Sequence, residues 1–295
     1  LKIHARQPEQ KPEVAAAKKI IAEGMPAAVK IAFTSGGRQY ELIPLSCAMD
    51  SAIKLLEDGT WLVRHVWPLV GFKSGQESWP GTASLEIAAW PGQVVLSLKL
   101  HPVKDNTVSD IEMDIVSGNK VLSERLSVRD SGNMTTAATR LVMDRTTPAA
   151  EQVSIQAMYK EAALPTVWDN RTGSWTVHLP AVGELPAEMS HAYPALLNNR
   201  ENIRLSLSNN GKDTVTVPLS VEKVINNRLD NISIKNALSI TGMCFVVYDT
   251  RKRLTGLPVQ VSKNWHQSER IYEYEGYWYR GTLLVKVPPG SVVDF

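Results

Sequence analysis

The sequence predicts an all-β protein with two antiparallel β-sandwich-like domains and one short N-terminal helix. Three observations support this fold class. Apolar and polar residues alternate with a period of two through most of the chain, which is typical of half-buried antiparallel strands. Turns rich in Gly, Asn and Pro separate these runs. After residue 24 the helical period is almost absent, which argues against a nucleotide-binding α/β fold.

The predicted helix covers residues 12–23. Pro12 suits a first helical position, good helix formers follow it, and Gly24 suits the end. Val14, Ala17 and Ile21 recur at helical spacing and share one face. We therefore expect a peripheral helix that packs on the first sheet.

The first domain is predicted to span residues 1–130. A glycine-rich turn at residues 35–38 and a Pro-Gly pair at residues 91–92 are expected to close two hairpins, the second through a type II turn. The strands expected in this domain cover residues 28–33, 39–43, 61–67, 85–90, 94–100 and 111–115.

A polar, threonine-rich stretch, residues 131–148, is predicted to link the domains, with a short strand possible around Leu141. The second domain is predicted to span residues 149–295. An Asn-Asn-Gly turn is expected to join two of its strands as a hairpin, and residues 243–248 suit a central strand. The abrupt C-terminus leads us to expect further domains in a longer protein. The strands expected in this domain cover residues 153–159, 175–179, 203–207, 215–219 and 243–248.

Composition and missing motifs exclude several classes of function. The formal net charge is +2, from 32 basic and 30 acidic residues, so a sustained basic face for nucleic acid or a dominant membrane-surface role is not expected. No apolar run reaches the length of a bilayer span. The six histidines are scattered, and the usual nucleophile, phosphate and zinc motifs are missing, so no cofactor and no metal site are predicted.

The two cysteines, Cys47 and Cys244, leave two interpretations open. They are either two buried thiols or one disulfide formed in an oxidising compartment. Their spacing does not match a metal or redox motif.

Aromatic and polar residues concentrate between residues 257 and 281. Such rings offer an apolar face to a pyranose, while nearby amide and cationic groups bond its hydroxyls or carboxylates. Alternation puts Trp278, Arg280 and Thr282 on one face of a strand, opposite Leu283. The same rings also suit a packed sheet corner, so both interpretations stay open. The predicted ligand-binding residues are Trp265, His266, Lys263, Asn264, Trp278 and Arg280.

Two segments carry a resemblance to a known class of proteins. Residues 85–92, Leu-Glu-Ile-Ala-Ala-Trp-Pro-Gly, and residues 256–266, Gly-Leu-Pro-Val-Gln-Val-Ser-Lys-Asn-Trp-His, resemble segments of large secreted β-rich bacterial proteins encoded among polysaccharide-degradation genes. The resemblance implies a multidomain protein, secreted or periplasmic, in a carbohydrate-related setting. It implies no catalytic residue.

We therefore expect the carbohydrate-recognition portion of a secreted polysaccharide-active protein, with an oligo- or polysaccharide as its partner. One alternative is a structural or protein-interaction β-sandwich. Another is a complete glycoside hydrolase or polysaccharide lyase, which needs facing carboxyl groups, or a Tyr or His base beside a cation. A second cluster, at Trp168 and Asp169, fits either sugar binding or a side-chain turn. The carboxylates available to a hydrolase are Glu77, Glu86, Asp169, Glu201, Glu273 and Glu275.

Overall fold

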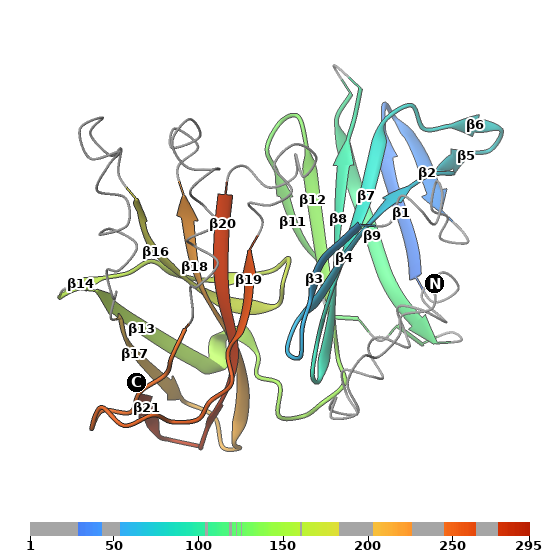
Figure 1. Cartoon of the computed structure of the whole chain (residues 1–295). Helices are drawn as coiled ribbons and strands as arrows, with labels where there is room; N and C mark the ends of the chain where they lie inside the picture. The colour runs from blue at the N-terminus through green and yellow to red at the C-terminus, as the bar shows by residue number, and fades with distance from the viewer. Residues whose placement is uncertain are drawn as a thin grey trace, which may run out of the picture. The chain divides into compact units, whose positions relative to one another are not determined.

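A computed structural model shows that the described part of the chain is nearly all β-strand (Figure 1). Its one described helix is a single 3-10 turn, η3 (Ala150–Gln152). The N-terminal helix predicted for residues 12–23 lies outside the described residues. The structure describes residues 29–42, 54–103, 106–117, 120–121, 123–124, 126–159, 161–182, 203–225, 245–263 and 277–295.

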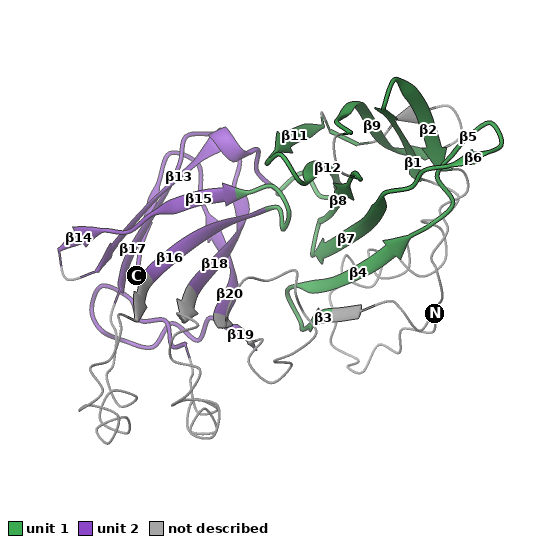
Figure 2. Cartoon of the chain, turned by 90° about the horizontal axis from the view of Figure 1, so that it is seen from above, with its two compact units in different colours: residues 1–147, 169–173 green, residues 148–168, 174–295 purple. Residues whose placement is uncertain are grey.

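The chain divides into two compact units (Figure 2). Unit 1 contains residues 1–147 together with the short segment 169–173. Unit 2 contains residues 148–168 and 174–295.

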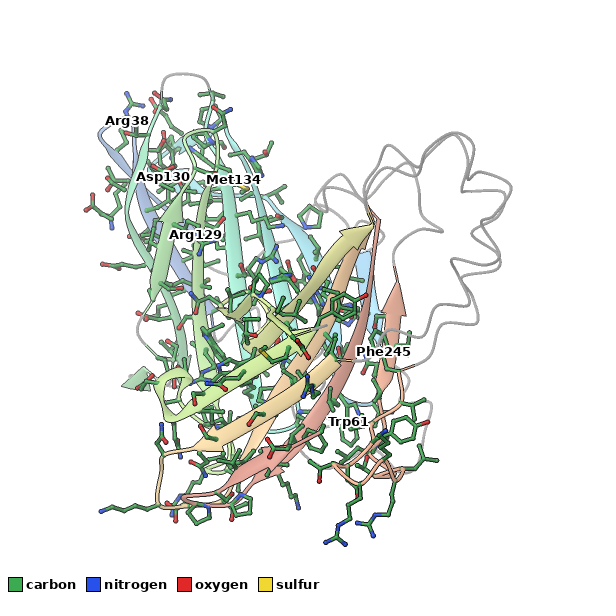
Figure 3. The ribbon with its side chains drawn as sticks, turned by 90° about the vertical axis from the view of Figure 1, so that its left-hand side faces the viewer. Arg38, Trp61, Arg129, Asp130, Met134 and Phe245 are labelled. Carbon is green, nitrogen blue, oxygen red and sulfur yellow. The ribbon has the colours of Figure 1, made fainter. Side chains whose placement is uncertain are left out.

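The stretch 131–148, predicted as a linker, contains the whole second strand of a β-hairpin. Asp130 Oδ1 accepts a hydrogen bond from the Gly132 backbone N–H at 2.9 Å, and the Ser131 N–H donates to the Met134 carbonyl at 3.0 Å. Asp130 and Met134 are labelled at this turn in Figure 3. The turn joins β11 (Ser127–Asp130) to β12 (Thr135–Val142), and unit 2 begins at Pro148.

Unit 1 contains two six-stranded sheets, and all their described strand pairs are antiparallel. The first sheet has the order β10 (Lys120–Val121), β9 (Val108–Ser117), β1 (Val29–Ser35), β2 (Arg38–Leu42), β5 (Lys73–Ser74) and β6 (Glu77–Ser78). The second has the order β11, β12, β8 (Gln93–His101), β7 (Thr82–Trp90), β4 (Val63–Leu69) and β3 (Lys54–Asp58).

Both predicted tight turns of unit 1 are confirmed. Ser35 pairs with Arg38 across Gly36 and Gly37, whose φ values of 58° and 75° suit a type I′ hairpin. The β7–β8 hairpin turns through Gly92, whose φ is 90°. Positive φ is costly for residues with a Cβ, so glycine at these positions determines the strand register.

One hydrophobic core in unit 1 takes side chains from both sheets. Phe33 of β1 belongs to it, as do Leu85 and Ile87 of β7 and Leu96 of β8, all at 0% exposure. Burying each such side chain stabilises the fold by roughly 1.5–3 kcal/mol. Strands β7 and β8 are also buried on their second face, which carries polar side chains such as Glu86, Ser97 and Lys99 beside apolar ones such as Trp90 and Val95.

Unit 2 contains a four-stranded and a five-stranded sheet, and one core draws side chains from both. In the five-stranded sheet β16 and β18 are parallel, whereas the sequence predicts antiparallel strands. The four-stranded order is β14 (Ala162–Ala163), β13 (Val153–Tyr159), β17 (Ile203–Asn209) and β21 (Val292–Asp294). The five-stranded order is β15 (Thr166–Asp169), β16 (Ser174–Val182), β18 (Val215–Ile225), β20 (Tyr277–Val287) and β19 (Gln260–Lys263).

The predicted hairpin between residues 203–207 and 215–219 is wrong, because β17 and β18 belong to different sheets. Packed sheets lie about 10 Å apart, a distance that five extended residues can span. The buried side chain of Asn209, which is 1% exposed, stabilises this connection between β17 and β18. Its Nδ2 donates to the carbonyls of Asp213 at 2.8 Å and Val287 at 3.0 Å. Its Oδ1 accepts from the Gly211 N–H at 2.8 Å.

The central strand predicted at residues 243–248 is also wrong for its described part. Residues 245–247 lie outside the strands, and Tyr248 makes one isolated bridge with Leu254. Phe245 and Val247 pack on the core of unit 2, but Val246 and Tyr248 are exposed. A central strand would bury both sets, so the continuous apolar run has another role.

Candidate functional site

One edge of the five-stranded sheet gathers the ends of four strands. In the parallel pair, Val182 of β16 lies opposite Ile225 of β18, and Ile225 also lies opposite Tyr277, the first residue of β20. Lys263, the last residue of β19, lies opposite Tyr279. The chain therefore leaves β16, β18 and β19, and enters β20, at this same edge. We call it the sheet edge; β18 and β20 are seen side by side in Figure 1.

The sheet edge brings together two parts of the predicted ligand-binding set that are separate in sequence. Lys263 closes β19, and Trp278 lies in the second position of β20, opposite Val224 of β18. The side chains of Lys263 and Trp278 are not described, and Asn264, Trp265 and His266 lie outside the described residues. Antiparallel pairing of β19 with β20 nevertheless places the backbone of Lys263 one residue from that of Trp278 across the ladder.

Arg280, the sixth predicted residue, is fully described and buried. Its side chain is 3% exposed and pairs with Glu222 of β18, directly opposite in the ladder. Nε and Nη2 of Arg280 donate to Oε2 of Glu222 at 3.0 and 2.5 Å. Charge-assisted bonds of this kind are stronger than neutral ones. The guanidinium therefore holds β18 against β20 next to the sheet edge.

The face that carries Arg280 is polar across four neighbouring strands. Residues directly opposite each other share a face, and the register aligns His178, Glu222, Arg280 and Ser262 in one row. A second row contains Thr176, Ser220, Thr282 and Gln260. The other face carries the apolar core, including Leu283. The predicted separation of Arg280 and Thr282 from Leu283 is thus confirmed.

Burial differs along this polar face. Thr176, Ser220 and Thr282 are between 0% and 3% exposed, and the Ser220 and Thr282 hydroxyls lie 3.5 Å apart. His178 and Ser262 are half-buried, and they lie in the row next to the sheet edge. In each row the residue of β19 is half-buried, whereas Arg280 and the three other members of the second row are at most 3% exposed.

Sequence reasoning missed His178 and Glu222 as neighbours of Arg280. The local signal is present, because polar residues alternate with apolar ones at positions 174–178 and 219–222. Alternation identifies a polar face but does not say which strands pair. The parallel pairing of β16 with β18 supplies that missing information.

Unit 1 holds a separate buried ionic cluster on the second face of β7 and β8. Arg64 donates to Glu57 at 2.7 Å and through Nε to Glu86 at 2.8 Å, with a second bond from its Nη2 to Glu86. Lys99 lies 4.0 Å from the other oxygen of Glu86. All four side chains are at most 8% exposed. Compensation of each charge by a neighbour is what lets ions stay buried, so this cluster has a structural role.

The cluster at Trp168 and Asp169 forms a side-chain turn, which is one of the two interpretations that the sequence left open. Asp169 Oδ1 accepts from the backbone N–H of Arg171 at 2.9 Å and from its Nε at 3.2 Å. Burial alone would lower the pKa of Arg171, but the charges of Asp169 and Glu86 outweigh it, so the pKa is raised. Trp168 packs edge-on against Trp175, with ring centroids 4.5 Å apart.

The turn that follows Asp169 supplies acceptors for two buried donors of unit 1. Trp90 Nε1 donates to the Thr172 carbonyl and Gln93 Nε2 to the Gly173 carbonyl, both at 2.5 Å. Trp90 and Gln93 are each 0% exposed. These bonds explain why residues 169–173 belong to unit 1, although the strands on either side belong to unit 2.

Comparisons with protein-family models, curated proteins and solved structures find no match for the chain. Among the described residues, no group of three His, Cys, Asp or Glu side chains is arranged to hold a metal ion. The described helical content also includes no segment long and apolar enough to cross a membrane.

Proposed function

We propose that the chain is the carbohydrate-recognition portion of a secreted or periplasmic polysaccharide-active protein, formed by two β-sandwich-like units. The observation that carries the proposal is the register of β18, β20 and β19. It brings Lys263 and Trp278 to one sheet edge, beside the half-buried His178 and Ser262.

In this proposal the chemistry of each side chain determines which part of the sugar it contacts. Trp265 and Trp278 stack on the apolar faces of sugar rings, while Lys263, Asn264 and His266 bond hydroxyl or carboxylate groups. Arg280 acts as a positioning residue, because its guanidinium already binds Glu222. Its role is to keep β18 and β20 in register.

A structural or protein-interaction role is the second candidate, and one observation favours it. Thr176, Ser220, Thr282 and Arg280 are at most 3% exposed, so half of the polar face is covered. A sugar site then depends on the sheet edge alone. Under the structural alternative, Trp265 and Trp278 are themselves core residues whose loss unfolds the unit.

An enzyme complete in this chain has less support. Of the carboxylates predicted from sequence, Glu86 accepts hydrogen bonds from Arg64, and Asp169 accepts them within its own turn. Glu86 shares Arg64 with a second carboxylate, Glu57, but both are at most 1% exposed and so are closed to a substrate.

The test is a glycan-array screen of the chain beside reducing-end and unsaturated-product assays on the same neutral and acidic polysaccharides. The Trp265→Ala/Trp278→Ala double variant should lose binding and keep its melting temperature. Tyr159→Ala, a half-buried aromatic residue in the other sheet of unit 2, is the matched control and should bind normally. A large loss of stability in the double variant would support the structural role, and product formation would support an enzyme.

A further inference from the structure

A short hairpin before β19 places apolar side chains in solvent. The Asp249 N–H donates to the Arg253 carbonyl at 2.8 Å and the Thr255 N–H to the Val247 carbonyl at 3.0 Å. Tyr248 and Leu254 are bridge partners between these two bonds. We call residues 245–257 the basic hairpin, because Arg251, Lys252 and Arg253 form its tip.

The two sides of the basic hairpin differ in burial but not in polarity. Phe245 and Val247 face inward, and the ring of Phe245 lies where a Cβ on Gly281 would be. Phe245 is labelled in Figure 3. Alternation predicts polar residues at the outward positions. Those positions instead hold Val246, Tyr248 and Leu254, which are 51%, 48% and 67% exposed.

The tip is preorganised by its one carboxylate. Asp249 Oδ1 accepts from the backbone N–H groups of Arg251 and Arg253 at 2.9 Å each, and Oδ2 accepts from Arg253 Nε at 2.8 Å. The backbone bond from Arg253 is the largest reason why the pKa of Asp249 is lowered. Since Asp249 compensates Arg253, the charges of Arg251 and Lys252 are the surplus at the tip.

We propose that the basic hairpin docks on an anionic lipid surface, with Tyr248 and Leu254 at the headgroup boundary and Arg251 and Lys252 on lipid phosphates. Exposed aliphatic and tyrosine side chains next to cations are the combination that binds this interface. A polyanionic glycan would satisfy the cations, but it offers no apolar phase for Val246 and Leu254. Apolar patches of this kind mark interaction surfaces.

The expected affinity is modest and reversible. Each cation near an anionic surface contributes about 1 kcal/mol, so removing two should weaken partitioning about 30-fold. Replacing the leucine and tyrosine by serine should weaken it at least about tenfold through lost apolar burial. The contact is local, which is compatible with a net charge of only +2 for the chain. It does not depend on the proposed carbohydrate site.

The test is co-sedimentation of the chain with vesicles of phosphatidylglycerol and phosphatidylcholine at 30:70, against vesicles of phosphatidylcholine alone. We expect binding to the anionic vesicles, lost in 1 M salt, where the Debye length shrinks to about 3 Å. The Arg251→Gln/Lys252→Gln and Tyr248→Ser/Leu254→Ser variants should lose it. Lys212→Gln/Lys286→Gln removes two exposed cations elsewhere in unit 2 and is the matched control.

Three results would overturn the inference: no vesicle binding by the parent chain, an equal loss in the lysine control, or binding to soluble polygalacturonate in place of vesicles. Because the changed residues are exposed, we expect the variants to fold, which near-ultraviolet circular dichroism checks. A Leu254→Trp variant allows a second measurement, which detects lipid contact directly and does not depend on a variant that fails to bind. Brominated phosphatidylglycerol should quench its extra fluorescence, and absence of that quenching would count equally against lipid contact.

Discussion

Replacing Asn209 by alanine tests how the chain crosses between the two sheets of unit 2. The change removes a buried amide that bonds to the carbonyls of Asp213 and Val287 and to the Gly211 N–H. Val287 is 0% exposed, so its carbonyl cannot recover a water partner, and leaving it unpaired costs about 1–3 kcal/mol. The other two groups lie in a more exposed turn and lose about 0.5 kcal/mol each. The expected destabilisation is about 2–4 kcal/mol.

Urea unfolding of Asn209→Ala beside Asn210→Ala measures this difference. Asn210 is exposed, and its backbone N–H bonds to the Gln152 carbonyl, a bond that alanine keeps, so its loss should stay within about 0.5 kcal/mol. The melting temperature should fall by about 2–4 °C for each kcal/mol lost. Equal midpoints for the two variants would refute the reasoning.

The Asn209→Asp variant separates hydrogen bonding from packing. An ionised carboxylate would face the carbonyl oxygen of Val287, so the folded state should raise the pKa of the new group. A raised acid pKa means that stability is highest below the ordinary aspartate pKa and falls as pH rises through the folded value. A pH-independent loss of stability would argue that the amide acts through packing alone.

Three further changes test other parts of the fold. Gly281→Ala should cost about 1–3 kcal/mol in urea unfolding, because its Cβ would lie 2.6 Å from the Phe245 ring; unchanged stability would show that the ring moves easily. Arg64→Met should cost about 3–5 kcal/mol by the same assay, because it strands two buried glutamates, and a neutral result would mean that water reaches them. In an NMR titration the Asp249 carboxyl should titrate below the ordinary aspartate range, and the basic hairpin should lose order as pH falls through that midpoint. An ordinary midpoint would argue against the turn bonds.

Local turn chemistry was predictable from sequence, and strand pairing over long distances was not. The glycines at residues 36, 37 and 92 must adopt positive φ, so the turns they make are specified by their own residue types. The crossing at Asn209 carries an equally strong turn signal but connects different sheets. That choice depends on Leu207 and Val217 facing one shared core, which no local pattern reveals.

The same difference between local patterns and long-distance strand pairing applies to the candidate site. Alternation correctly separated Arg280 and Thr282 from Leu283, because face alternation is a property of a single strand. The ion pair with Glu222 depends on the register between β18 and β20, and the approach of His178 depends on a parallel pair. The exposed apolar side chains of Val246 and Tyr248 could not be predicted from the sequence, since alternation predicts polar residues at outward positions.

The assignment of residues 169–173 to unit 1 has a consequence for how the chain can be synthesised and divided. A ribosome that has reached Thr147 has not yet made the carbonyls that Trp90 and Gln93 bond, so unit 1 is complete only after Gly173 has emerged. By then the first strands of unit 2, β13, β14 and β15, have already been translated. A fragment cut at Pro148 therefore leaves two donors of unit 1 without their acceptors, and expression of the separate halves should begin from boundaries that keep this turn.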